Sequence, residues 1–191
     1  MRAGENWFEL NGIASWSSWL RGSISLIARY NARLMDKMSG HIEIRAVAAE
    51  CLIDLRHAVL RKGLPRETAM FAGDEDASSR HFVAEVDGVV VGCVTLHLNE
   101  WAHEPAWQLR GMAVAESHQG RGIGSKLLLA VEQSIVQSPA GVPRLLWCNA
   151  RTPAALFYGR HGWQVVSEEF EIPTAGPHVK MMKRLGMKDE G

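Results

Sequence analysis

The sequence predicts one mixed α+β domain, in which helices flank a largely antiparallel sheet that contains one strand–helix–strand crossover. Residues 107–114 alternate like a strand and continue through a glycine-rich turn into an amphipathic helix at 123–136. Asp87-Gly88, a strong hairpin signal, separates two alternating segments. The apolar segment 144–148 follows the helix, so we expect it to run parallel to residues 107–114.

Capping and turn signals place the remaining elements. Residues 47–62 carry an apolar helical stripe that ends before Gly63. A second helix is expected to begin with Thr152 as its N-cap and Pro153 in its first turn, and to stop at Gly162. Further strands are expected at 41–46, 81–86, 89–98, 164–170 and 178–185, and loops at 64–80, 99–106 and 138–143.

The chain divides into residues 41–185, which form the predicted domain, an N-terminal extension (1–40) and a short tail (186–191). The extension is rich in tryptophan and arginine and poor in acids. It fits an amphipathic helix that docks on the domain or on a second subunit, or a membrane-surface or targeting segment. It also fits a dispensable segment, because Met38 lies directly before the first clear strand, and we favour this third interpretation.

Composition limits the class of protein. A hydrophobic content of 47% and a charged content of 22% are those of a soluble domain with an ordinary core. The formal net charge is zero, which argues against nucleic acid as a partner. No run of 18 apolar residues is present, so we expect no membrane-spanning helix. The spacing of Cys51, Cys93 and Cys148 is not that of metal ligands, so we expect no metal. Three scattered cysteines, an odd number, fit a reducing compartment, so we expect a cytoplasmic protein. We expect a monomer or a homodimer.

The turn between the central strand and its helix, residues 119–124 (QGRGIG), suits a phosphate. Alternating glycines bring several backbone N–H groups together at a helix start, where the dipole favours an anion. A Rossmann fingerprint is excluded because Ser125 stands where its third glycine would be. A Walker P-loop is excluded because Gly124-Ser125-Lys126 lacks the required Gly-Lys-Ser/Thr order.

The remaining pattern, Q-x-x-G-x-G after a hydrophobic strand, resembles motif A of the GNAT superfamily of acyl-CoA-dependent N-acyltransferases. Residues 154–163 (AALFYGRHGW) are similar to the family's A-x-x-x-Y-x-x-x-G-[FW] helix, and residues 176–181 (GPHVKM) to its final strand. The motifs keep the family's order and spacing over residues 41–185, and residues 55–80 resemble uncharacterised bacterial members. We therefore expect the GNAT fold.

The resemblance implies that acetyl-CoA lies in a slot where the two parallel strands separate. Pantetheine amides would pair with the backbone of residues 112–114, and the pyrophosphate would lie on the glycine-rich turn. Arg121 fits either a phosphate contact or a solvated surface arginine. The implied cofactor-binding residues are Met112, Ala113, Val114, Gln119, Gly120, Arg121, Gly122, Gly124 and Ser125.

The same resemblance makes Tyr158 the general acid that protonates the departing thiolate, with a packed core aromatic as the alternative. The backbone N–H near Met112 and Ala113 would polarise the thioester carbonyl. Where the family often has a cofactor-contacting asparagine, this chain has Arg151, with Asn149 two residues earlier, so that role is not transferred. Candidate general bases are His97, Glu100, His103, Glu104 and His178.

These residues predict transfer of an acetyl group from acetyl-CoA to a primary amine of a small molecule or peptide by direct attack. The acceptor itself is not predicted, because the loops at 64–80 and 99–106 carry no recognisable code. The alternative is a non-catalytic acyl-CoA-binding regulatory domain on the same fold. A third hypothesis is a membrane-associated module organised by residues 1–40.

Overall fold

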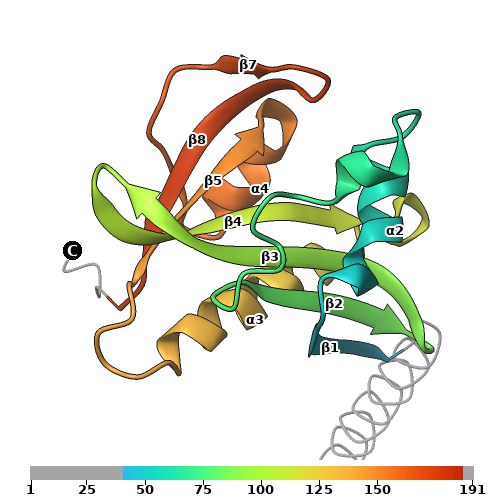
Figure 1. Ribbon diagram of the computed structural model, residues 1–191, viewed down its shortest axis with the longest axis horizontal. Coiled ribbons are helices and arrows are strands. Elements are labelled where there is room, and N and C mark those ends of the chain that lie inside the picture. The colour runs from blue at the N-terminus through green and yellow to red at the C-terminus, as the bar shows by residue number, and fades with distance from the viewer. Residues whose placement is uncertain (1–40, 187–191) are drawn as a thin grey trace, which may run out of the picture. The chain divides into compact units, whose positions relative to one another are not determined.

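The computed structural model describes residues 41–186, so the predictions for residues 1–40 and 187–191 lie outside the described residues. Eight strands form one sheet in the order β1-β2-β3-β4-β5-β8-β6, and β7 also pairs with β8 (Figure 1). The pairs are antiparallel except β4 and β5, which run parallel as the crossover predicts. The strands are β1 (Ile42–Val47), β2 (Arg80–Val86), β3 (Val89–Trp101), β4 (Glu104–Val114), β5 (Leu145–Arg151), β6 (Gln164–Val165), β7 (Phe170–Ile172) and β8 (Gly176–Arg184).

Helices cover both faces of the sheet. Alternation along β2 separates the two faces, because Val83 packs in one cluster with Leu52 and Ala84 in the other with Leu127. Thus α2 covers one face, and α3 and α4 cover the opposite face (Figure 1). The helices are α2 (Glu50–Leu60), α3 (Ile123–Val136) and α4 (Ala155–Arg160), with short 3-10 helices η1 (Arg66–Ala69), η2 (Glu116–His118) and η3 (Thr152–Ala154).

Helix α3 supplies much of the main core. Its apolar stripe is buried against β1 to β4, and each fully buried side chain of this size contributes about 1.5–3 kcal/mol relative to exposure. The buried residues of the helix are Ile123, Leu127, Leu128, Val131 and Ile135. None of the helices in residues 41–186 is long and apolar enough to cross a membrane.

The predicted loop at 99–106 is wrong, because β3 and β4 extend through it as a hairpin. The turn is only Ala102 and His103, both with positive φ (51° and 64°), and neither is a residue type that signals such a turn. Tertiary packing stabilises the extension. The Trp101 ring lies 5.6 Å from the Trp147 ring and 5.5 Å from the Lys180 ammonium nitrogen.

Two smaller predictions also need correction. Thr152 is not an N-cap, because its hydroxyl donates to Glu169 (2.8 Å) while the chain enters through η3 and the α-helix begins only at Ala155. The predicted strand 164–170 is divided into β6 and β7. Between them the Ser167 hydroxyl, rather than a backbone carbonyl, accepts the hydrogen bond of the Lys180 N–H (2.8 Å).

A β-bulge in β4 positions the strand end that the site uses. The register with β3 changes by one residue between Cys93↔Ala113 and Thr95↔Arg110. Gly111 lies in the bulge with φ +60°, and a Cβ there would lie 2.7 Å from the Arg56 Nε. The bulge therefore needs glycine both for its backbone conformation and for the close approach of a buried arginine.

That arginine belongs to a buried polar network that the sequence did not reveal. The Arg56 guanidinium, which is fully buried, bonds Asp74 (2.5 Å) and the Thr95 hydroxyl (2.5 Å), and Arg110 also bonds Asp74 (3.1 Å). Burial by itself would raise the pKa of Asp74. The hydrogen bond and charge of Arg56, with the Phe71 amide and Arg110, outweigh burial and lower it. The network ties the 61–79 loop to the sheet.

Hydrogen-bond complementarity fixes the tautomer of His81 in this network. Its Nε2 lies 2.9 Å from the Asp74 carbonyl, which can only accept, so Nε2 carries the proton. In the neutral ring Nδ1 can then only accept, so the Thr95 hydroxyl, 2.7 Å away, donates to Nδ1 while its oxygen accepts from Arg56. Each of these hydrogen bonds along Arg56–Thr95–His81–Asp74 thus joins a donor to an acceptor, whereas the buried Arg56 Nε has no hydrogen-bond partner among the described residues.

Gly111→Ala is expected to lower the free energy of unfolding by about 2–4 kcal/mol, because it adds an overlap with Arg56 to the cost of positive φ. Urea unfolding measures the loss. Gly88→Ala is the matched control, since Gly88 also has positive φ (79°) but a Cβ there would meet nothing within 4 Å. Equal losses in the two variants would contradict a steric role for Arg56.

Candidate active site

The site begins where β4 and β5 separate. The two strands pair only at Trp107↔Leu146 and Gln108↔Trp147, so the following residues of β4 have no partner in β5. The bulge at Gly111 lies in this unpaired part of β4. A gap between parallel strands leaves backbone N–H and C=O groups able to pair with an extended ligand.

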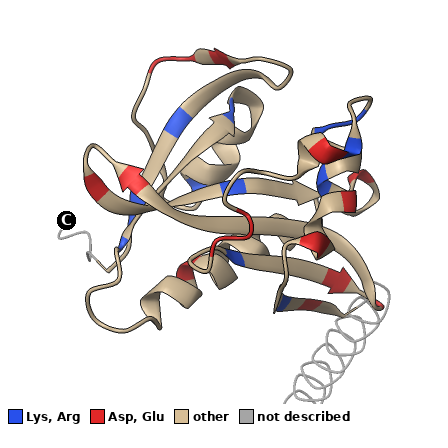
Figure 2. Ribbon diagram, viewed as in Figure 1, with Lys and Arg blue, Asp and Glu red and all other residues tan. Residues whose placement is uncertain are grey.

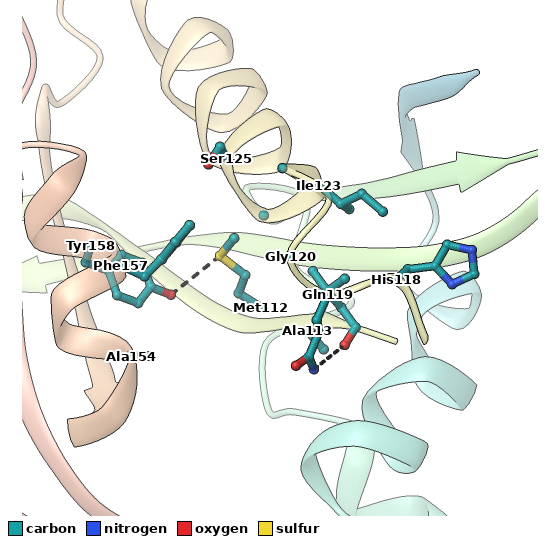
Figure 3. A pocket seen from close by; sticks show the side chains of 13 residues that line it. Met112, Ala113, His118, Gln119, Gly120, Ile123, Ser125, Ala154, Phe157 and Tyr158 are labelled. Atoms are coloured by element: carbon teal, nitrogen blue, oxygen red, sulfur yellow. Dashed lines mark hydrogen bonds between the residues drawn. The ribbon is translucent and has the colours of Figure 1, made fainter. Parts of the chain in front are cut away.

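A first pocket of about 460 Å³ lies between the end of β4, the start of α3 and α4 (Figure 3). It brings together eight of the nine residues that the sequence singled out for the cofactor, and also Tyr158; Arg121 is not among the lining residues. The lining residues are Met112, Ala113, Val114, His118, Gln119, Gly120, Gly122, Ile123, Gly124, Ser125, Ala154, Phe157 and Tyr158. Sequence reasoning missed Ala154 and Phe157, although both lie in the tyrosine-containing segment it had singled out.

The glycine-rich turn leaves room for a ligand. Gly122 is the N-cap of α3 with φ +76°, and a Cβ there would meet no atom within 4 Å. The N–H groups of the first helical turn have no intrahelical partner, so they are available to an anion. The Gln119 side-chain amide donates to the Val114 carbonyl (3.0 Å) and ties the turn to β4 (Figure 3). That carbonyl has a second lone pair and can still accept from a ligand amide.

Ser125 has a partner of its own. Its hydroxyl lies 3.0 Å from His161 Nε2, and the His161 ring packs 4.9 Å from the Phe157 ring. These contacts link the first turn of α3 to the end of α4. The two walls of the first pocket therefore support each other.

Tyr158 lies in α4, buried at the centre of the site. Its hydroxyl donates to the Met112 thioether sulfur (3.5 Å), as Figure 3 shows. Burial, with a smaller effect from Cys148, raises the pKa of Tyr158, so the phenol keeps its proton at any physiological pH. A thioether is a weak acceptor, so the hydroxyl loses little when it turns to a better one, such as a thiolate.

A second pocket, of about 250 Å³, shares Met112, Ala154 and Tyr158 with the first. Both pockets therefore reach the tyrosine. The lining residues are Leu60, Arg61, Phe71, Gln108, Leu109, Arg110, Gly111, Met112, Asn149, Ala150, Arg151, Ala154, Tyr158, Ile172, Ala175 and His178. No sequence motif points to Arg61, Phe71 or Arg110 as lining residues, because only the fold brings the end of α2 and the following loop to β4.

Of the five candidate bases, only His178 lines either of these two pockets. His97 lies 3.1 Å from the Ser79 hydroxyl, and the other three lie at the β3–β4 turn, at the opposite end of β4 from Met112. His178 Nδ1 lies 2.6 Å from the Gly176 carbonyl, which can only accept, so Nδ1 carries a proton. In the neutral ring, Nε2 is then free to accept one.

No group of three or more His, Cys, Asp or Glu side chains arranged to hold a metal ion occurs in residues 41–186. The cysteines in this part of the chain are free. Burial raises the pKa of both Cys93 and Cys148 to about 12, so neither presents a thiolate at neutral pH.

Comparison with known proteins agrees with this fold. The profile of the Acetyltransferase (GNAT) family matches residues 50–163. The chain is 29% identical over 147 residues to the uncharacterized N-acetyltransferase YitI of Bacillus subtilis (strain 168), covering 75% of this chain and 97% of that protein.

Solved structures resemble the fold. Escherichia coli ElaA superposes with a TM-score of 0.61 at 17% identity, over 74% of this chain and 99% of that chain. An aminoglycoside 6'-N-acetyltransferase complexed with coenzyme A superposes with a TM-score of 0.60 at 14% identity, over 78% and 99%.

A mixed sheet with separated parallel strands and a glycine-rich turn at the start of a helix agrees with the fold that the sequence predicts. The chain belongs to the GNAT acetyltransferase family. It is an N-acetyltransferase of this family. The comparisons favour this assignment over the non-catalytic domain considered as an alternative.

Proposed function

We propose that the protein transfers an acetyl group from acetyl-CoA to a primary amine of a small molecule or peptide by direct attack. The observation that carries the proposal is that two pockets meet at Tyr158. The first pocket ends at a phosphate-compatible helix start, and the second is lined mostly by other residues and shares Tyr158 with the first. Donor and acceptor therefore have separate places with one proton donor between them.

In the proposed reaction the amine nitrogen forms a bond to the thioester carbonyl carbon, and the carbon–sulfur bond then breaks. The part of β4 near Met112 and Ala113 has no partner in β5, which supports polarisation of the carbonyl by a backbone N–H group there. Tyr158 gives its proton to the departing thiolate. The raised pKa of the two buried cysteines favours direct attack over an acyl-cysteine intermediate.

We propose His178 as the group that accepts the amine proton, through Nε2 or through one water. It is the only candidate base in the described part of the chain that shares a pocket with Tyr158. An α-amine needs little help from a base, because its pKa of about 8 leaves roughly a tenth of the amine neutral at pH 7. The free thiols are compatible with a reducing compartment, and we place the enzyme in the cytoplasm.

A thiol-release assay with acetyl-CoA and a broad panel of amines and peptides tests this function. We expect CoA release to depend on both the enzyme and an amine. Binding of acetyl-CoA by calorimetry, with no amine accelerating thiol release, would support the non-catalytic alternative instead.

We also propose that residues 1–40 are dispensable for this activity, because every described element of the site lies after them. A chain that begins at Met38 is expected to melt within about 3 °C of the full chain, which corresponds to about 1 kcal/mol or less for a domain of this size. Its affinity for acetyl-CoA should also match. A markedly lower melting temperature, seen by circular dichroism, would mean that the extension completes the core or an interface.

A further inference from the structure

The residues that line the second pocket indicate which chemical class of amine accepts the acetyl group. Three arginines line it, from the end of α2, from β4 and from the end of β5: Arg61, Arg110 and Arg151. No aspartate or glutamate is among its described lining residues. Of the acids in the surrounding elements, Asp74 contacts both Arg56 and Arg110, and Glu169 contacts Thr152. The pocket therefore carries an excess of positive charge.

Two of these arginines donate hydrogen bonds to the same backbone carbonyl oxygen. Arg61 Nη1 lies 3.0 Å and Arg151 Nη2 lies 3.4 Å from the same backbone oxygen, that of Leu60. One carbonyl thus holds two guanidinium groups side by side, although like charges at this separation repel. Arg61 also lies over the Phe71 ring at 5.3 Å, so its direction is set by stacking as well.

Electrostatics agree with this geometry. Burial, then the charge of Arg151 and then that of Arg56, lower the pKa of Arg61, and no acid offsets them. The Nε of Arg110, which is buried, has no hydrogen-bond partner among the described residues. An anion between these groups would relieve the repulsion and give the guanidinium forks a bidentate partner.

The charge is a property of the pocket and not of the whole surface. Over the described domain, basic and acidic segments are interspersed along the sheet and helices (Figure 2). Arg151 occupies the position where a cofactor-contacting asparagine was considered, yet it lines the second pocket and not the first. Its charge is thus presented to the acceptor side of Tyr158.

We propose that the acceptor amine also carries an anionic group, a carboxylate or a phosphate, which Arg61 and Arg151 bind in the second pocket. This inference rests on the proposed acetyl transfer. Binding of the anion fixes the amine beside Tyr158 and His178, which line the same pocket. Neutral amines lack that contact and are poorer substrates.

Matched pairs of amines test the inference. L-amino acids are compared with their amides for the carboxylate, and O-phosphoethanolamine with ethanolamine for the phosphate. We expect at least one anionic series to exceed its neutral counterparts in kcat/KM by about 10- to 100-fold, as expected for a charge-assisted contact. The two arms show which anion the pocket prefers. Equal or higher kcat/KM for the neutral amines would overturn this inference while leaving the acetyl transfer intact.

Substitutions of the two arginines test whether they cause the preference for anionic amines. Arg151→Gln, at an exposed residue that the fold does not require, and Arg61→Gln are each expected to raise KM for the anionic amine by about 10-fold or more. Each should lower kcat/KM for the neutral amine much less, so that the preference for the anionic amine is lost. Arg45→Gln, which removes the same charge at the far β1 edge, is the control and should leave both unchanged. Equal losses for charged and neutral amines would indicate a structural role only.

A binding measurement keeps the inference testable if no amine in the panel turns over. Calorimetry on the CoA-saturated protein compares N-acetylglycine with N-acetylglycinamide, and N-acetyl-O-phosphoethanolamine with N-acetylethanolamine. We expect tighter binding of an anionic product and loss of that preference in Arg151→Gln. No preference for either anion would overturn the inference, whereas a preference without turnover would leave the anion site standing and count against the proposed transfer.

Discussion

Gly122→Val is expected to abolish measurable acetyl-CoA binding while the domain stays folded. A Cβ at this position meets no protein atom within 4 Å, so the valine side chain would extend into the open space of the first pocket at the start of α3. That is where the backbone must approach a pyrophosphate closely. Titration calorimetry with acetyl-CoA measures the loss.

The backbone cost of this substitution needs its own control. Valine at φ +76° costs of order 1–3 kcal/mol of stability, whatever the ligand does. Gly88→Val carries the same kind of penalty at φ +79° in the β2–β3 turn, also with open space around it and away from both pockets. If the two variants bind acetyl-CoA equally well, the glycine-rich turn does not hold the pyrophosphate.

Tyr158→Phe is expected to slow turnover by about 100-fold or more, the range of a lost general acid. The ring keeps its packing against Phe157 and Trp163, at 5.2 and 5.4 Å, so affinity for acetyl-CoA should change only a few-fold. Some activity should remain, because a thiol with a pKa near 8.5 leaves fairly well unaided. Steady-state kinetics and calorimetry on the same preparation separate the two effects.

The pH–rate profile sharpens this test. The active form of Tyr158 is the protonated one, and burial raises its pKa above the ordinary value of about 10. The wild-type enzyme should therefore show an acidic limb, where the acceptor amine becomes protonated, and no alkaline limb below about pH 10. Tyr158→Phe should lower the whole profile without moving the acidic limb. An unchanged turnover number would leave Tyr158 as a core aromatic only.

Local signals in the sequence predicted most of the fold. The Asp87-Gly88 turn joins β2 to β3, and the crossover rule gave the parallel pairing of β4 with β5. The β3–β4 hairpin was missed because Ala102 and His103 adopt positive φ without a turn signature. Its length depends on Trp101 packing against residues far along the chain, which periodicity does not reveal.

The first pocket was predictable because a contiguous turn and one helix supply most of its lining. The second pocket was not, since Arg61, Arg110 and Arg151 come from three elements with no shared motif. The bulge at Gly111 was equally hidden. The bulge requires glycine because the buried Arg56, 55 residues earlier in the chain, lies against it. Hydrophobic periodicity does not predict that a charged residue such as Arg56 is buried in the core.

The most direct test of acetyl transfer at this site follows the acetyl group itself. Acetyl-CoA labelled in the acetyl carbon is mixed with the enzyme and an accepted amine, and mass spectrometry quantifies labelled N-acetyl product against released CoA. We expect equal amounts of the two at every time point and no labelled protein, because the amine attacks the thioester directly. Release of CoA without labelled amide, or accumulation of acetylated enzyme before product, would contradict direct transfer between the two pockets.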